Sequence, residues 1–262
     1  MRRMVQPMSE QPVAEEAGVL LAQVQQGPVP NHVAVIMDGN GRWARQRGLP
    51  RWEGHRAGMK SVREVIEGAA AAGVQHLTLY AFSKENWDRP AAEVGALMRL
   101  LEEYIAREKA ELIESRIRVS VFGDLGRLPR SVRDAIAELE ESTRSGDALW
   151  VHLAISYGSR SEIVEACRSL AAACRDRSLS PEQIDESRLA AQLLTREWPD
   201  PDLLIRTSGE QRISNFLLWQ IAYSEILVTP VLWPDFKRQN LFAALLEFRR
   251  RDRRFGMVRS RT

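Results

Sequence analysis

The stretch HVAVIMDGNGRWA, residues 32–44, decides the fold. It begins with a short apolar run, Val33–Met37, whose length and β-branched residues predict a buried strand. The run ends at Asp38-Gly39-Asn40-Gly41, where two glycines within four residues let the backbone turn sharply. A buried strand that ends in such a turn is typical of the first βα unit of a parallel sheet.

The rest of the chain alternates between apolar runs of strand length and longer segments with helical spacing. This alternation predicts an α/β fold: a single domain with a central, mostly parallel six-stranded sheet flanked by helices. Further strands are expected at His76–Phe82, Ile117–Phe122, Trp150–Ile155, Leu203–Arg206 and Glu225–Val228. Helices are expected at Met59–Ala72, Ala91–Ser115, Ser131–Thr143, Ser161–Arg175, Asp185–Leu194 and Phe236–Arg250.

The composition near the two ends places the domain boundaries. Residues 1–29 are polar and contain several prolines, so we expect a flexible N-terminal tail that is either loose or helical. The folded domain is expected over residues 30–256, followed by a C-terminal tail over residues 257–262.

Composition also narrows the class of protein. The chain has 262 residues, 44% of them hydrophobic, which is enough for one large domain with a substantial core. A net charge of +2 gives no reason to expect a nucleic-acid partner. No apolar run is long enough to span a bilayer, and the first residues lack a signal peptide's apolar core, so we expect a cytoplasmic location. Cys167 and Cys174 are too far apart on a helix for a disulfide and are expected in the core.

Ligands bind at the carboxyl ends of strands in parallel sheets, and three polar clusters follow predicted strands. In the first, Asp38 offers a hard oxygen for Mg²⁺, and the N–H groups around Gly39 and Gly41 can face an anion. Arg42 can clamp phosphate oxygens, with Arg51 and His55 downstream. The cluster is neither a P-loop nor a dinucleotide fingerprint. The alternative is an ordinary Asn-Gly turn with an exposed aspartate.

The second cluster is Ser83–Pro90. Ser83 can donate to a phosphate, Asn86 can position a group or relay a proton, and Arg89 can pair with an anion. Trp87 offers an apolar wall, although core packing is the simpler role for it. The alternative for the cluster is a helix entry in which Pro90 takes the first helical position.

The third cluster, Arg206–Phe216, holds two arginines six residues apart, a spacing that suits an anionic group at a strand end. Glu225 is a second carboxylate that could meet Asp38 across the sheet and share a metal ion. Alternatively, Arg206 is a solvated strand end and Glu225 an ordinary surface acid.

Taken together, these motifs resemble those of the cis-prenyltransferases, in particular the bacterial undecaprenyl diphosphate synthases. The resemblance runs in order from about Pro30 to Gly256. It is carried by residues 32–44, 78–90 and 205–225, by Leu232–Phe236, and by Arg253-Arg254-Phe255-Gly256.

The resemblance implies a Mg²⁺-dependent transferase of prenyl groups, a homodimer with an apolar tunnel for the growing chain. Its substrates would be isopentenyl diphosphate and an allylic diphosphate such as farnesyl diphosphate. Asp38 would be the essential metal carboxylate, Glu225 the second, and Asn86 would match the position of the proton acceptor. The allylic diphosphate would be bound by Gly39, Asn40, Gly41, Arg42, Arg51 and His55. Isopentenyl diphosphate would be bound by Ser83, Arg89, Arg206, Arg212 and Ser214, and the substrate region would include Trp43, Lys84, Glu85, Trp87 and Ile213.

Some residues depart from the family pattern or concern product length. Gln211 stands where many relatives have histidine, Ser208 replaces a usual glycine, and Ser156 and Ser159 change the Asn-Tyr-Gly-Gly-Arg motif. Ala81 is small at a position where a bulky residue would block a long chain, which favours an undecaprenyl-length product.

The alternatives are a short-chain or irregular cis-prenyl diphosphate synthase, expected to show a bulky wall in the tunnel, and a non-catalytic partner subunit, expected to lack Asp38. An undecaprenyl product would serve as cell-wall carrier lipid, so peripheral contact with the inner face of the membrane is possible. The basic segment Arg249–Arg261 could aid that contact, although it also reads as a solvated helix end.

Overall fold

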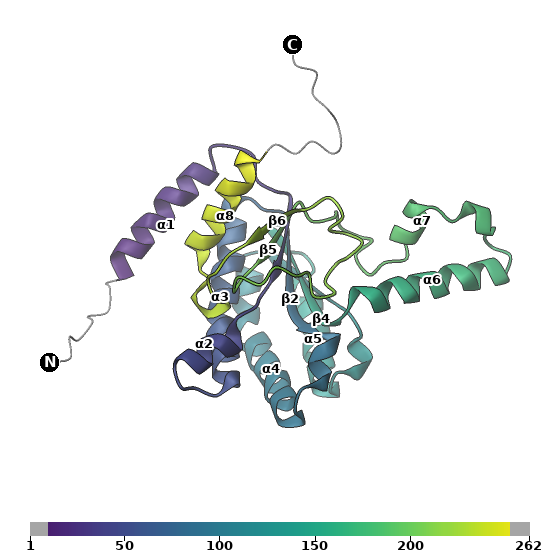
Figure 1. The fold of residues 1–262 in the computed structure, drawn as a ribbon, viewed down its shortest axis with the longest axis horizontal. Helices are drawn as coiled ribbons and strands as arrows, with labels where there is room; N and C mark the ends of the chain where they lie inside the picture. Colours follow the sequence, from purple (N-terminus) through teal and green to yellow (C-terminus); the bar gives the residue numbers. More distant parts are fainter. Residues whose placement is uncertain (1–9, 252–262) are drawn as a thin grey trace, which may run out of the picture.

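The fold is built on one six-stranded sheet, seen in a computed structural model that describes residues 10–251 (Figure 1). The strand order is β3-β4-β2-β1-β5-β6, and all five pairings are parallel. The strands are β1 His32–Ile36, β2 His76–Ser83, β3 Ile117–Phe122, β4 Leu149–Tyr157, β5 Leu203–Arg206 and β6 Glu225–Val228. The predicted fold class and all six strands are confirmed, with shifts at the strand ends.

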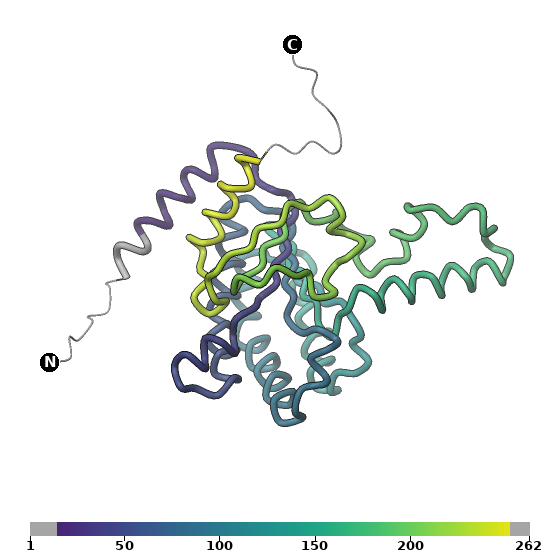
Figure 2. Tube along the Cα trace, in the orientation of Figure 1, coloured from purple at the N-terminus to yellow at the C-terminus, as the bar shows by residue number. Residues whose placement is uncertain are grey.

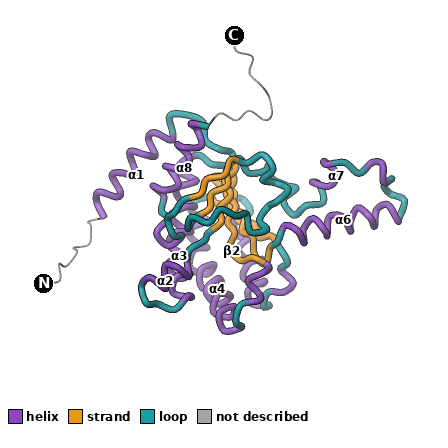
Figure 3. Tube along the Cα trace, viewed as in Figure 1, coloured by secondary structure: helices purple, strands orange, loops and turns teal. Residues whose placement is uncertain are grey.

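Both faces of β1 are buried, which explains why it is apolar from Val33 onward. Val33 and Val35 face the larger apolar cluster, whereas Ala34 and Ile36 face the smaller one. Figure 3 shows the strands at the centre, enclosed by helices and loops. The larger cluster contains residues of α3 Arg51–Ala72, α4 Ala91–Glu114, α5 Arg130–Thr143 and α8 Arg238–Arg250. The smaller cluster is covered mainly by the segment 198–221.

Helices α2 Asn40–Gln46 and α3 differ from the sequence expectation at the end of β1. The Asp-Gly-Asn-Gly stretch does not end in an open loop: α2 starts directly after Gly39. The following helix, α3, begins at Arg51 rather than at Met59, because Pro50 directly before it is a residue that favours the start of a helix. Only Gly48 and Leu49 lie between Pro50 and Arg47, the residue that caps α2.

The expected flexible tail over residues 1–29 needs correction for the part that the structure describes. Helix α1 Glu10–Val24 packs beside α8, as Figure 1 shows, and its Val24 is 1% exposed. Arg249 of α8 donates from Nη2 to the Gln23 carbonyl at 2.8 Å. An apolar helix face bound to the body belongs to the folded domain. The C-terminal tail 257–262 and the Arg253–Gly256 motif lie outside the described residues.

Helices α6 Ser159–Arg175 and α7 Glu186–Ala190 extend away from the sheet (Figure 2). The expectation that both cysteines lie in the core is wrong, because Cys167 on α6 is exposed and Cys174 only partly buried. A projecting helix has fewer neighbours to cover its sides. Among residues 10–251, no helix combines the length and the apolar character needed to cross a membrane.

A histidine cluster lies near the amino ends of the central strands. The ring of His32 is bonded through Nδ1 to the Pro199 carbonyl at 2.6 Å and through Nε2 to the Thr78 hydroxyl at 2.7 Å. Because a carbonyl only accepts, Nδ1 carries the proton and Nε2 accepts from Thr78. His152 is fully buried and stacks on Trp198 with ring centroids 4.0 Å apart. Burial lowers the pKa of His32 to about 4 and also lowers the pKa of His152.

We expect acid to destabilise the fold through these histidines. In the unfolded chain they titrate near pH 6.5, so that state binds more protons as the pH falls below this value. The free energy of unfolding should therefore drop by about 2 kcal/mol for each buried histidine between pH 7 and pH 5. Urea unfolding of the wild type and of His152→Asn at both pH values checks this, and an equally steep drop in the variant would contradict the role of His152.

Candidate active site

The carboxyl ends of β1, β2 and β5 open onto a cavity of about 580 Å³, which we call the central cavity. Its mouth is polar, and its deeper wall is apolar, formed by Met59, Val62, Leu79 and Leu101. Many of the residues selected from the sequence line it. They are Asp38, Asn40, His55, Ser83, Glu85, Asn86, Arg89, Arg206, Arg212 and Ser214. Segments far apart in the chain are thus brought together at one edge of the sheet.

Asp38 and Arg206 form an ion pair at the mouth of the central cavity. Asp38 accepts through Oδ2 from Arg206 Nη2 at 2.7 Å and through Oδ1 from the Gly39 N–H at 2.7 Å. Arg206 is only 3% exposed. Thr207, which was not predicted as a site residue, accepts through its hydroxyl from the Asp38 N–H at 2.8 Å and donates to the Asp38 carbonyl at 2.6 Å. These bonds fix the backbone that carries the carboxylate.

Gly39 is required where β1 turns into α2. Its φ of 110° lies in the region that favours glycine, and a Cβ there would stand 3.1 Å from both Leu232 Cα and Ser208 Cβ. Gly39 has no side chain to cap the helix, so the first N–H groups of α2 can donate to another acceptor, such as a bound anion.

A second set of ion pairs lies beside the first. Arg42 donates from Nη1 to the Ser208 carbonyl at 2.8 Å and pairs through Nη2 with Glu210 at 2.5 Å. Glu210 also pairs with Arg212 Nη1 at 2.7 Å. Arg206 donates from Nη1 to the Ser214 hydroxyl at 2.8 Å. Glu210 was not predicted as a site residue. It pairs with two arginines, Arg42 and Arg212, that could bind an anionic ligand in its place.

The loop after β2 forms the 3₁₀ turn Lys84–Asp88. Asn86 lines the cavity, and its Oδ1 accepts from the Ser83 N–H at 3.1 Å. Glu85 accepts from Asn215 Nδ2 at 2.8 Å. Trp87 packs against the larger apolar cluster and does not line the central cavity, and its Nε1 donates to Ser156 Oγ at 2.8 Å.

His55 stands among cations. Burial, together with the charges of Arg89 and Arg51, lowers its pKa to about 4, so the imidazole is neutral near pH 7. Glu93, which the sequence analysis also missed, pairs with Arg89 at 3.2 Å and with Arg51 at 3.6 Å. The Arg89–Glu93 spacing of four residues was the available signal.

Other selected residues lie outside the central cavity. Trp43 donates from Nε1 to Asp235 Oδ1 at 2.8 Å, Lys84 donates to Ser161 Oγ at 3.1 Å, and Ile213 packs in the smaller apolar cluster. Arg42 pairs with Glu210 and Arg51 with Glu93, and neither arginine lines the cavity. Gly41 lies in the first turn of α2, and its role in binding the allylic diphosphate stays a prediction. Gln211 is exposed and does not line the cavity.

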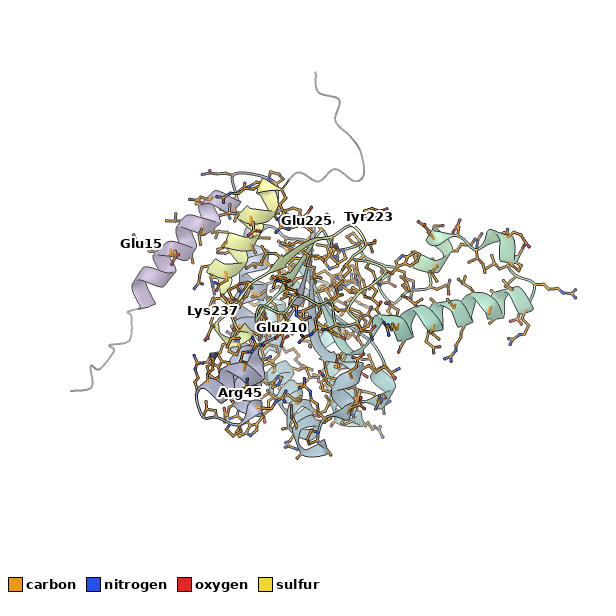
Figure 4. The ribbon with its side chains drawn as sticks, in the orientation of Figure 1. Glu15, Arg45, Glu210, Tyr223, Glu225 and Lys237 are labelled. Carbon is orange, nitrogen blue, oxygen red and sulfur yellow. The ribbon has the colours of Figure 1, made fainter. Side chains whose placement is uncertain are left out.

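The expected meeting of Glu225 with Asp38 across the sheet is wrong within one chain. Glu225 begins β6 and is level with Leu203, the first residue of β5, whereas Asp38 follows the end of β1. The two carboxylates therefore lie at opposite ends of parallel strands. Glu225 pairs with Arg251 at 3.0 Å. Figure 4 shows Glu225 at the upper end of the sheet and Glu210 well below it.

The donor set fits Mg²⁺ shared with a ligand rather than Mg²⁺ held by the chain alone. Within residues 10–251, no three His, Cys, Asp or Glu side chains gather to hold a metal ion. Mg²⁺ is commonly bound by one or two carboxylates together with phosphate oxygens and water. Asp38, with a partly exposed carboxylate at the mouth, is the residue that would hold it.

Ser208 is strained at its place beside Gly39. Its φ is 75°, in the left-handed region, and its buried hydroxyl has no hydrogen-bond partner. We expect Ser208→Gly to stabilise the protein by about 1 kcal/mol, because it removes both penalties at a small cost in chain entropy. Thermal unfolding should show a melting temperature about 2–4 °C higher. A lower melting temperature would mean that the hydroxyl has a stabilising role.

Comparisons with known proteins agree on one family. The prenyltransferase family model, described as "Putative undecaprenyl diphosphate synthase", matches residues 36–256. An isoprenyl transferase of Heliobacterium mobile is 46% identical over 99% of this chain and 100% of its own length.

Two solved structures share the fold. Lavandulyl diphosphate synthase from Lavandula x intermedia, in complex with dimethylallyl diphosphate, superposes with a TM-score of 0.85 at 41% identity, covering 87% of this chain and 99% of that one. The crystal structure of "a probable undecaprenyl diphosphate synthase" from Campylobacter jejuni gives 0.73 at 33% identity, covering 88% and 100%. This chain therefore belongs to the undecaprenyl diphosphate synthase family of cis-prenyltransferases and is an enzyme that transfers prenyl groups.

Proposed function

We propose that this enzyme lengthens an allylic diphosphate, such as farnesyl diphosphate, by Mg²⁺-dependent condensation with isopentenyl diphosphate to a Z-polyprenyl diphosphate. The observation that carries the proposal is the layout of the central cavity. Its mouth places Asp38 beside Arg206, Arg212 and Arg89, and its depth is apolar. The arginines at the mouth suit a diphosphate group, and the aliphatic side chains in the depth suit a prenyl tail.

In the reaction, the allylic carbon–oxygen bond breaks as the isopentenyl double bond forms the new carbon–carbon bond, and a proton is then lost. Negative charge grows on the leaving diphosphate, and Mg²⁺, when bound, supplies Lewis-acid stabilisation of that charge. Arg42 and the N–H groups at the start of α2 bind the allylic diphosphate, while Arg89, Arg206, Arg212 and Ser214 hold isopentenyl diphosphate. The apolar wall excludes water from the allylic carbon.

Asn86 orients the isopentenyl group rather than taking up its proton. A neutral amide is a poor base, and its oxygen already accepts from the Ser83 N–H. We therefore assign Asn86 to hold the isopentenyl group through its NH₂, and the proton to a diphosphate oxygen or to Asp38.

The enzyme is proposed to work as a homodimer. Within one chain Glu225 lies at the far end of the sheet, so it can serve the metal only if a second subunit brings it to the mouth of the cavity. The proposed setting is the cytoplasm, with peripheral contact at the inner face of the membrane where a long prenyl product would partition.

For product length, the sequence favours undecaprenyl diphosphate, the carrier lipid of cell-wall synthesis. Ala81 supports it: the residue is exposed to the central cavity at an irregular register between β2 and β4, and its methyl group leaves room above Leu79. A short-chain product is the second candidate. It is favoured by a bulky residue, Tyr104, at the far end of the cavity, and by the likeness to a lavandulyl diphosphate synthase.

We expect Asp38→Ala to lower the rate of prenyl transfer by about 100-fold or more, because it removes the carboxylate that would hold Mg²⁺ and pairs with Arg206. The assay follows labelled isopentenyl diphosphate with farnesyl diphosphate and Mg²⁺. Circular dichroism confirms that the variant folds, and Glu15→Ala, on the distant helix α1, is the control. Full activity of Asp38→Ala, or no incorporation by the wild type with any allylic primer, would contradict the proposed function.

We expect Ala81→Leu to shorten the products without preventing the first condensation. The larger side chain would fill part of the cavity beside the prenyl tail. Thin-layer chromatography of the dephosphorylated products measures this, and an unchanged length distribution would show that the tail does not pass Ala81.

A further inference from the structure

The central cavity ends at one side chain. Helices α3 and α4 both start at the mouth and run down beside the sheet. His55, Met59 and Val62 line the cavity at increasing depth on α3. On α4 the deepest lining residue is Tyr104, thirteen residues after Ala91, which at 1.5 Å per residue is about 20 Å below the start of the helix. Tyr104 is therefore placed where the end of a prenyl chain would arrive.

A second, small cavity of about 20 Å³ lies directly behind Tyr104, and we call it the lower cavity. Tyr104 lines both cavities, and it is the one residue common to their walls among residues 10–251. The lower cavity lies between the same two helices and reaches Ile117 at the start of β3. Its apolar wall is formed by Ile66 and Leu112, and its charged lining residues are Arg63, Glu67, Glu108 and Glu111. The tyrosine ring thus separates two parts of one gap between α3, α4 and the sheet.

The ring lies above a buried carboxylate that is paired with two more exposed arginines. Glu108, one helical turn below Tyr104, is 4% exposed and accepts from Arg63 Nη2 at 2.5 Å and from Arg107 Nε at 2.7 Å. The Arg107 guanidinium also lies over the Tyr104 ring, 5.6 Å from its centroid. A buried carboxylate that lost these partners would be strongly destabilised, so the pair resists displacement by an apolar chain. Burial and the negative charge of Glu108 raise the pKa of Tyr104, so the phenol stays neutral.

We propose that Tyr104, held by the Arg63–Glu108 ion pair, is the floor that limits how long the prenyl chain grows. The inference rests on the proposed function and deepens it, because it names the residue that determines product length. A chain that reaches the ring meets an aromatic wall backed by charges, and further growth would have to bury apolar carbon against the ion pair. Removal of the ring joins the two cavities and lets the chain advance toward Ile66 and Leu112.

Tyr104 could instead be an ordinary core residue, and matched variants separate the two roles. Tyr104→Leu keeps an apolar side chain but removes the outer part of the ring, and Tyr104→Phe keeps the ring. Ile105→Ala is the control, since Ile105 is 5% exposed on the same helix but lines neither cavity. It should cost comparable stability without opening the floor.

The experiment measures the length distribution of products from farnesyl diphosphate, labelled isopentenyl diphosphate and Mg²⁺. We expect Tyr104→Leu to move the longest product by at least one isoprene unit beyond that of the wild type, while Tyr104→Phe and Ile105→Ala keep the wild-type length. A product ladder from the wild type that does not lengthen in Tyr104→Leu, or that lengthens equally in Ile105→Ala, overturns the proposal.

A binding measurement keeps the inference separate from catalysis. Thiodiphosphate analogues of increasing prenyl length are titrated into the wild type and into Tyr104→Leu. Wild-type affinity should stop rising with length at a limit that moves to longer chains in the variant, and the same limit in both proteins overturns the proposal. Absence of any prenyl transfer by the wild type would count against the proposed function, and this titration would still test the floor.

Discussion

A buried arginine sets the constraint on which the site depends. Arg206 ends β5 with 3% of its surface exposed, and a guanidinium so deeply buried requires polar partners, which its two Nη atoms have and its Nε lacks among the described residues. Asp38 meets it from the turn after β1, and Ser214 meets it from the loop that follows β5. This one charge therefore links the ends of β1 and β5, which are neighbours in the sheet but far apart in the sequence, with the 210–215 segment. The same ion pair places a carboxylate and cations at one point, which is the chemistry that a metal-bound diphosphate requires.

From the ion pair inward, the lining of the central cavity changes from charged to apolar side chains. The mouth holds the arginines and Asp38, the middle holds Ala81 and Leu79 of β2, and the depth holds Leu101 and Tyr104 of α4. Because α3 and α4 run parallel from the same edge of the sheet, the gap between them guides a chain in one direction only. In the proposed function, different elements therefore recognise the diphosphate and limit the length of the prenyl tail.

The sequence predicted the sheet well because buried parallel strands are continuous apolar runs, as Val33–Met37 and Leu203–Arg206 show. It also predicted Asp38, Asn86 and Arg206 at the site, since residues after such strands share one edge. It failed for Glu225, because strand pattern alone does not tell which end of the sheet a terminal residue occupies. Tyr104 was not selected because helical spacing shows that a side chain is buried but not that it faces a cavity.

The most direct test of this account is a crystal structure with farnesyl thiodiphosphate and Mg²⁺. The account predicts the diphosphate at the mouth of the central cavity, between the start of α2 and Arg206, with Mg²⁺ on Asp38. The prenyl tail should pass Ala81 and point toward Tyr104. A diphosphate bound away from Asp38, or a tail directed outside the gap between α3 and α4, would contradict the central claim.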